Sequence, residues 1–189
     1  MNSDKTVSNP EASTFLIIIM GVSGSGKSTL AKALTDIYGY EYLDGDDFHS
    51  LESKSLMAQG IPLTDVNRAP WVAAIKQRLK DNGNHLTHTI LAFSGLKQKH
   101  RDELRAAGLK TLFLYLDGNK EIIQDRINNR KGHFVAPTLL DSQFASMEDP
   151  LCELDVHLVN VAPGFEQVSQ QAQAIIDKHF QRLESPIIL

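Results

Sequence analysis

A glycine-rich stretch directly after an apolar run constrains this chain more than any other feature. The run Phe15–Met20 (FLIIIM) has the length and composition of a buried strand, and GVSGSGKS follows it at residues 21–28. This stretch fits the phosphate-loop pattern G-x-x-x-x-G-K-[ST] at every fixed position. Apolar residues then recur at helical spacing as far as residue 38, and Gly39 is a typical helix stop. We therefore predict a strand, a phosphate loop and a helix in succession.

Such a loop binds phosphate because of its backbone geometry. Glycines accept the dihedral angles that turn successive N–H groups toward one anion, and the start of the following helix adds its positive end. Lys27 supplies a point charge for the outer phosphates, and Ser28 supplies a hydroxyl oxygen for Mg²⁺. The residues predicted to bind nucleotide phosphates here are Gly21, Val22, Ser23, Gly24, Ser25, Gly26, Lys27, Ser28 and Thr29.

A cluster of aspartates follows the second strand candidate. The sequence LDGDDFH at residues 43–49 brings Asp44, Asp46 and Asp47 to the carboxyl end of that strand, where ligands bind in open parallel sheets. A phosphotransfer site needs one carboxylate near Mg²⁺ and another to accept the proton of an attacking hydroxyl. We predict that Asp44 is a metal ligand with Ser28 and that Asp46 is the catalytic base. A solvated acidic turn is the alternative.

Short apolar runs alternate with longer amphipathic segments along the chain. This alternation predicts an α/β fold with a mostly parallel five-stranded sheet and helices on both faces. We expect one kinase domain at residues 15–182, between a polar, disordered tail at 1–14 and a C-terminal tail at 183–189. The expected strands are 15–20, 40–44, 88–93, 110–117 and 155–160. The expected helices are 28–38, 96–108, one that starts at about 120, and 165–180. Residues 48–82 are expected to be mostly helical, with interruptions at 60–62 and 68–70.

Several motifs together resemble one family. GVSGSGKST, YLDGDDFH, GIPLTDVNRAPW, SGLKQKHRDELR, RKGHF and LLDSQFASMEDP occur in the order found in gluconate kinases, and the match runs from about residue 15 to 180. The resemblance implies a nucleoside-monophosphate-kinase-like three-layer sandwich, with a helical acceptor-binding insertion at about 48–82 and a lid at about 126–137. It also implies phosphorylation of D-gluconate at its 6-hydroxyl by ATP, and a homodimer.

Three departures from the family pattern lie near the expected acceptor pocket. The family usually has CSALK where this chain has FSGLK at residues 93–97, and proline where Ser50 follows His49. The next segment usually reads N-x-x-KM, and here it is ESKSLM at residues 52–57. The exact sugar acid is therefore left open.

Both substrates carry negative charge, so the protein needs basic side chains to bind each of them. Gluconate is a carboxylate, so its pocket needs cations or aligned N–H groups, and a lid arginine can neutralise the transferring phosphoryl group. We predict Arg126 and Arg130 as catalytic and ATP-binding residues, although either could instead pair with surface acids. The residues predicted to bind the acceptor are Asp46, His49, Arg68, Lys97, Arg101 and His133.

Composition excludes several other classes of protein. The net charge of −4 and the pI of about 5.9 argue against a nucleic-acid or anionic-membrane partner. No apolar run reaches the length of about 18 residues that a membrane span needs. The single cysteine, Cys152, cannot form an internal disulfide. We therefore expect a cytoplasmic protein.

Other acceptors and one other class of function remain open. Shikimate kinases share an Asp-x-Asp element, but the glycine-rich arginine motif that they carry is missing here. Adenylylsulfate kinases share DGD, but they lack the RKGHF element. A nucleotide-driven switch would bind a protein partner instead, and GNKEI at residues 118–122 lacks the aspartate of a guanine reader.

Overall fold

One sheet of five parallel strands organises the protein in the computed structural model, which describes residues 13–129 and 137–184. The strand order is β2-β3-β1-β4-β5, so β1 is central and pairs with β3 and β4. The predicted bounds of β1 and β4 are confirmed, and those of the other three strands are shorter by one or two residues. The strands are β1 (Phe15–Met20), β2 (Glu41–Asp44), β3 (Thr89–Ala92), β4 (Lys110–Asp117) and β5 (Val156–Asn160).

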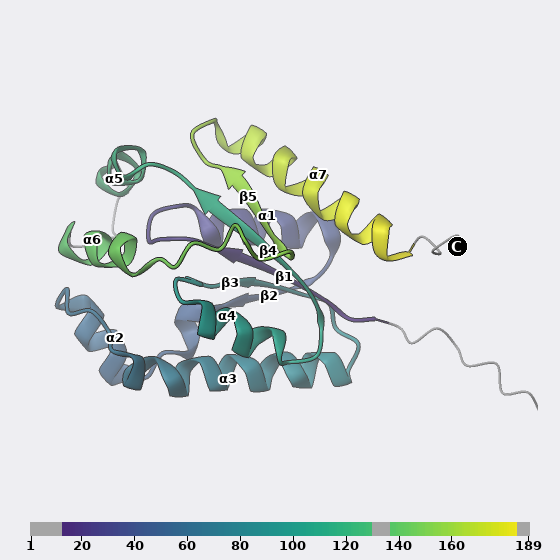
Figure 1. The fold of residues 1–189 in the computed structure, drawn as a ribbon, viewed down its shortest axis with the longest axis horizontal. Helices are drawn as coiled ribbons and strands as arrows, with labels where there is room; N and C mark the ends of the chain where they lie inside the picture. The colour runs from purple at the N-terminus through teal and green to yellow at the C-terminus, as the bar shows by residue number, and fades with distance from the viewer. Residues whose placement is uncertain (1–12, 130–136, 185–189) are drawn as a thin grey trace, which may run out of the picture.

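Helices cover both faces of the sheet, which confirms the predicted three-layer sandwich (Figure 1). Helices α1 (Lys27–Tyr38) and α7 (Phe165–Glu184) pack on one face, and α3 (Asp65–Asn84) and α4 (Gln98–Arg105) pack on the other. Three shorter helices are α2 (Leu51–Ala58), α5 (Lys120–Asn128) and α6 (Pro137–Ser146). Within the described residues, no helix has an apolar stretch long enough to cross a lipid bilayer.

The central strand is buried on both faces. Ile17 and Ile19 pack with α1 and α7, whereas Leu16, Ile18 and Met20 pack with α3 and α4. All five side chains are fully buried. A continuous apolar run is what a strand needs when helices cover both sides of a parallel sheet. The strand therefore holds the loop that follows it at a fixed place on the sheet edge.

A third, smaller apolar cluster joins the phosphate loop to α5 and α6. It contains Val22 of the loop, Ile123 and Ile127 of α5, Leu140 of α6, and Leu96 from the segment after β3. The sequence reasoning did not predict α6. The cluster gives the loop an apolar support outside the two main cores.

The long helix α3 differs from the prediction. The sequence predicts an interruption at 68–70, but the helix starts at Asp65 and continues through Pro70. The reason is a capping box, in which the Thr64 side chain accepts a hydrogen bond from Asn67 N, and Asn67 Oδ1 accepts one from Thr64 N. Pro70 lacks only the one N–H that would bond to the carbonyl of Val66, so the helix tolerates it.

We expect Pro70→Ala to raise the free energy of unfolding by about 1 kcal/mol. Alanine restores a helical hydrogen bond, and this gain exceeds the entropy that proline removes from the unfolded chain. Urea unfolding measures the change. Pro62→Ala is the control, because Pro62 precedes the helix and no such bond is restored there. A less stable Pro70→Ala protein would contradict this account of α3.

Candidate active site

The phosphate loop occupies the carboxyl edge of the sheet, between β1 and α1. Gly24 and Gly26 have φ of 81° and 103°, which is the left-handed region that favours glycine. A Cβ on Gly24 would also lie 2.5 Å from Cγ1 of Ile127. The loop thus needs glycine at Gly24 for its backbone conformation and for its contact with α5.

Lys27 is the first residue of α1 and turns back over the loop. Its Nζ donates a hydrogen bond to the Val22 carbonyl at 2.9 Å. Burial lowers the pKa of the Lys27 ammonium, and the nearby carboxylates of Asp46 and Asp44 act in the opposite direction. The two aspartates therefore favour the charged form that a phosphate-binding lysine needs.

Asp44 is the last residue of β2, and its carboxylate accepts three hydrogen bonds. Its Oδ2 accepts hydrogen bonds from Ser28 Oγ at 3.1 Å and from the Tyr42 hydroxyl at 2.6 Å, and its Oδ1 accepts one from Asp46 N at 3.1 Å. Burial and the bond to Asp44 raise the pKa of Tyr42. The sequence reasoning missed Tyr42, which is two residues before Asp44 and so shares its face of the strand.

Ser28 and Asp44 fit the predicted magnesium site. Their oxygens lie 3.1 Å apart, and neighbouring oxygens around an octahedral Mg²⁺ with bonds of about 2.1 Å are separated by about 3 Å. Among the described residues, no group of three or more His, Cys, Asp or Glu side chains could hold a metal ion. A magnesium ion here would therefore complete its shell with water and substrate oxygens.

A cleft of about 890 Å³ brings most of the predicted catalytic residues together. The phosphate loop lies along it with Lys27 and Ser28. Asp44 and Asp46 also line the cleft, as do Arg126 of α5 and Phe165 at the start of α7. The volume lies within the range of about 300–1,000 Å³ typical of small-molecule sites.

Arg126 lines this cleft, but its hydrogen bonds go to backbone carbonyls. The guanidinium donates to Val161 and, at 3.5 Å each, to Ser25 and Pro163. These contacts tie α5 to the loop and to the segment between β5 and α7. They are compatible with nucleotide binding, and the catalytic role of Arg126 stays a prediction.

A stack of three rings lies beside the aspartates. His49 stacks on Trp71 with ring centroids 4.3 Å apart, and Trp71 stacks on Phe93 at 4.8 Å. Trp71 Nε1 donates to the Gly45 carbonyl at 2.6 Å, and a Cβ on Gly45 would lie 2.8 Å from the Ala92 carbonyl oxygen. His49 Nδ1 is buried and has no hydrogen-bond partner in the described part of the chain. A bound ligand could supply that partner.

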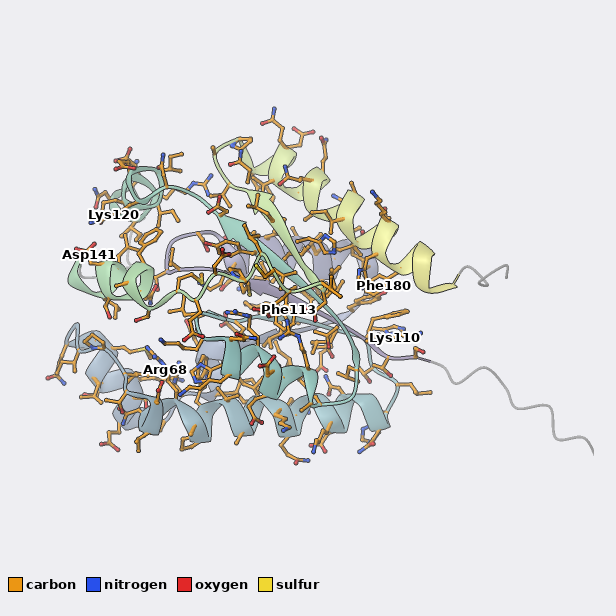
Figure 2. The ribbon with its side chains drawn as sticks, in the orientation of Figure 1. Arg68, Lys110, Phe113, Lys120, Asp141 and Phe180 are labelled. Atoms are coloured by element: carbon orange, nitrogen blue, oxygen red, sulfur yellow. The ribbon has the colours of Figure 1, made fainter. Side chains whose placement is uncertain are left out.

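The charge of Arg68 acts both on His49 of this stack and on His100. Arg68, labelled in Figure 2, is a half-buried residue of α3, and burial lowers the pKa of its guanidinium. Burial also lowers the pKa of His49 and of His100, and the charge of Arg68 lowers both further. The sequence reasoning missed His100 because nothing in QKHRDELR distinguishes it from a surface residue.

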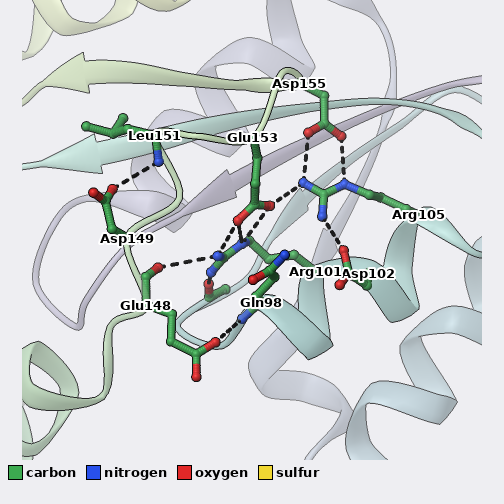
Figure 3. Close-up of polar contacts among 10 residues, drawn as sticks. Gln98, Arg101, Asp102, Arg105, Glu148, Asp149, Leu151, Glu153 and Asp155 are labelled. Carbon is green, nitrogen blue, oxygen red and sulfur yellow. Dashed lines mark hydrogen bonds and ion pairs between the residues drawn. The ribbon is translucent and has the colours of Figure 1, made fainter.

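The structure does not bring Arg101 to the cleft, which corrects its prediction as an acceptor ligand. The Arg101 side chain is fully buried, donates to the Gly95 carbonyl at 2.6 Å and to the Glu148 carbonyl at 3.3 Å, and forms an ion pair with Glu153 (Figure 3). Arg105 joins the same network through Glu153 and Asp155. The spacing of four residues predicts one helical face for Lys97 and Arg101, but it does not show that Arg101 is turned toward acids of the segment between α6 and β5.

Lys97 lies outside the cleft as well. Its Nζ pairs with Glu148 Oε1 at 3.2 Å, on a shallow surface that also includes Asp65 and Lys99. Its predicted contact with the acceptor stays a prediction. Arg130, His133 and most of the predicted lid lie outside the described residues, so their roles stay predictions.

The parallel sheet, the phosphate loop and the adjoining aspartates define a P-loop phosphotransferase. The AAA domain family model matches residues 16–151. A probable gluconokinase from Dictyostelium discoideum is 36% identical over 182 residues, which cover 93% of this chain and 90% of that protein. The thermosensitive gluconokinase of Escherichia coli is 35% identical, over 84% of this chain and 86% of that protein. The crystal structure of a gluconokinase from Sinorhizobium meliloti matches with a TM-score of 0.82 and 34% identity, over 91% of this chain and 95% of that chain. This chain belongs to the gluconokinase family.

We expect stability to fall as the pH drops below about 6.5. Folding lowers the pKa of His49, His88 and His100, so below that pH the unfolded chain binds more protons than the folded one. Stability therefore rises with pH up to about 6.5 and is then constant with respect to these groups. Urea unfolding at pH 5.5 and 7.5 measures the difference.

His88→Asn is the matched variant for this pH dependence. His88 Nδ1 accepts a hydrogen bond from Phe15 N at 3.0 Å, which requires an unprotonated nitrogen. The amide oxygen of asparagine can accept the same bond without titrating. The variant should therefore lose less stability than the wild type on acidification, and an equal or greater loss would show that His88 does not contribute.

We expect Arg101→Met to lower the free energy of unfolding by about 3–5 kcal/mol, because it leaves the Glu153 carboxylate without its buried partner. Thermal unfolding measures this loss. Lys97→Met, which breaks a half-exposed pair, should cost about 1 kcal/mol or less. A fully stable Arg101→Met protein with weakened acceptor binding would restore Arg101 as an acceptor ligand.

Proposed function

We propose that the protein is a gluconokinase that transfers the γ-phosphoryl group of ATP to the 6-hydroxyl of D-gluconate, giving 6-phosphogluconate and ADP. The observation that carries this proposal is the convergence of Lys27, Ser28, Asp44 and Asp46 on one cleft. The likeness to gluconokinases over nearly the whole chain supports the choice of acceptor.

The nucleotide end of the cleft is built by the loop and α5. N–H groups of residues 24–29 and the start of α1 bind the phosphates of ATP, and the Lys27 ammonium binds the outer ones. Arg126 and Phe165 lie in the same cleft, where they can contact the rest of the nucleotide. Arg130 is our candidate for neutralising the phosphoryl group during transfer, as an arginine from the lid.

Ser28 and Asp44 would hold Mg²⁺. When bound, this ion would neutralise negative charge on the phosphates of ATP. Tyr42 contributes by donating a hydrogen bond to Asp44 Oδ2, which fixes the orientation of the carboxylate.

Asp46 is the proposed catalytic base. It is exposed in the cleft, beside Asp44 and near Lys27. Its carboxylate accepts the proton of the 6-hydroxyl as that oxygen forms a bond to the γ-phosphorus. The bond from phosphorus to the bridging oxygen breaks, and ADP leaves with the electron pair.

The remainder of the acceptor would lie along the stacked rings. His49 offers a buried nitrogen with no partner among the described residues, and Arg68 offers a half-buried cation. Both suit the hydroxyls and the carboxylate of a sugar acid. His133 from the predicted lid stays a candidate for the same pocket. We also propose that the protein is a homodimer and that it is located in the cytoplasm.

We expect Asp46→Asn to lower kcat with gluconate by about 10²–10⁴-fold, because the amide cannot accept the hydroxyl proton. A coupled ADP-release assay measures kcat, and the KM for ATP should change by less than about threefold. Asp47→Asn is the matched control, since Asp47 is exposed in the same turn. It should keep most of the activity.

The same assay tests the acceptor. Gluconate should give the highest kcat/KM in a panel with other sugar acids, shikimate and adenylylsulfate. Turnover of shikimate or adenylylsulfate in preference to gluconate would overturn the proposed function, as would ATP hydrolysis that no small acceptor stimulates. Full activity of Asp46→Asn would overturn only the assignment of the base.

A further inference from the structure

Gln143 of α6 makes a two-point contact with the phosphate loop. Its Oε1 accepts a hydrogen bond from Ser23 N at 2.7 Å, and its Nε2 donates to Ser23 Oγ at 3.0 Å. The two residues are 120 positions apart in the sequence. Both the backbone and the side chain of Ser23 are therefore held by one amide from a distant helix.

The backbone contact acts on the peptide group that also holds Lys27. Ser23 N and the Val22 carbonyl belong to one planar unit. At the opposite end of this peptide group, the Val22 carbonyl oxygen accepts hydrogen bonds from Lys27 Nζ at 2.9 Å and from Ser25 N at 3.3 Å. Fixing the N–H thus fixes the direction of the carbonyl, and a hydrogen bond at one end of a peptide strengthens the bond at the other.

Helix α6 is well placed to act as a rigid support. Leu140 is fully buried in the third apolar cluster, and Glu148 N, just after the helix, donates to the Leu96 carbonyl at 2.8 Å. Asp141 pairs with Lys120 of α5 at 2.6 Å, and Figure 2 labels both residues where the two helices lie together. Gln143 therefore reaches the loop from an anchored position.

We propose that Gln143 is a positioning residue for Lys27, acting through the peptide between Val22 and Ser23. The lysine ammonium has three N–H donors, and Val22 takes one of them, which leaves two for phosphate oxygens. With the carbonyl held in place, these two donors point into the cleft before the nucleotide arrives. Loss of Gln143 lets the peptide turn, and Lys27 then loses its preferred direction.

This inference depends on ATP binding at the loop, which is part of the proposed function. Direct binding measurements separate the two, since they need no acceptor. A wild-type protein that does not bind ATP contradicts the proposed function. A wild-type protein that binds ATP, with variants that behave otherwise than described below, contradicts the role of Gln143 alone.

The test is a double-mutant cycle between Gln143→Leu and Lys27→Met, with the Kd for MgATP measured by calorimetry. We expect Gln143→Leu to raise the Kd about tenfold in the wild-type background, the loss typical of a hydrogen bond. In the Lys27→Met background it should raise the Kd less than twofold, because the lysine on which it acts is gone. Equal losses in both backgrounds would overturn the proposal, as would no loss in either.

Two controls separate positioning from a general loss of structure. Lys120→Met breaks the ion pair between α6 and α5 without contacting the loop, so it should leave the Kd within about twofold of the wild type. If it weakens ATP as much as Gln143→Leu does, the role of Gln143 is only to dock α6, and the proposal fails. Gln143→Asn, which draws the amide back from Ser23, replaces Gln143→Leu if that variant does not fold.

A comparison of nucleotides decides the matter if Lys27→Met binds MgATP too weakly to measure. Lys27 is proposed to bind the outer phosphates, which AMP lacks. Gln143→Leu should therefore raise the Kd for ATP about tenfold and the Kd for AMP less than twofold. Equal weakening of both nucleotides would overturn the proposal.

Discussion

The register of the three strands β2, β3 and β1 is the constraint on which the site depends. Ala92, the last residue of β3, lies opposite both Ile19 of β1 and Asp44 of β2. The three strands therefore end at nearly the same level, and the phosphate loop and the acidic turn emerge side by side. A shift of one strand by a single residue would separate Ser28 from Asp44 and would turn the buried face of β1 toward the wrong helix layer. The apolar packing of the sheet thus fixes the distance between the groups that meet in the cleft.

Charge is balanced locally around that edge. Burial opposes the charge of Lys27, and Asp44 and Asp46 favour it. The Asp44 carboxylate in turn is held by donors from Ser28 and Tyr42. Away from the cleft, the network of Arg101, Arg105, Glu153 and Asp155 pairs its charges with one another. The basic side chains of Arg68, His49 and His100 differ from these, because burial disfavours their charged forms more than nearby acids favour them. An anionic acceptor would relieve that imbalance.

The sequence predicted the parts of the site that depend on the chain's local pattern. The phosphate loop needs a fixed order of glycines, lysine and serine, and the acidic turn follows directly from a strand, so both could be found without the structure. The partners of the basic residues could not, because Arg101 and Lys97 meet acids some fifty positions away. The start of α3 was missed because Pro70 is a stronger local signal than the capping pair of Thr64 and Asn67. The contact of Gln143 with Ser23 was missed for the same reason as the arginine pairs, since it joins segments that only the fold brings together.

The ring stack gives the protein an optical property of its own. Trp71 is the only tryptophan in the chain, and its indole is sandwiched between His49 and Phe93. An imidazole quenches indole emission more strongly when it is protonated, and the emission colour follows the polarity around the ring. All of the tryptophan emission of this protein thus originates beside the acidic turn, where the indole N–H donates to the Gly45 carbonyl. The ultraviolet emission of the unlabelled chain is therefore a built-in signal of changes at that turn.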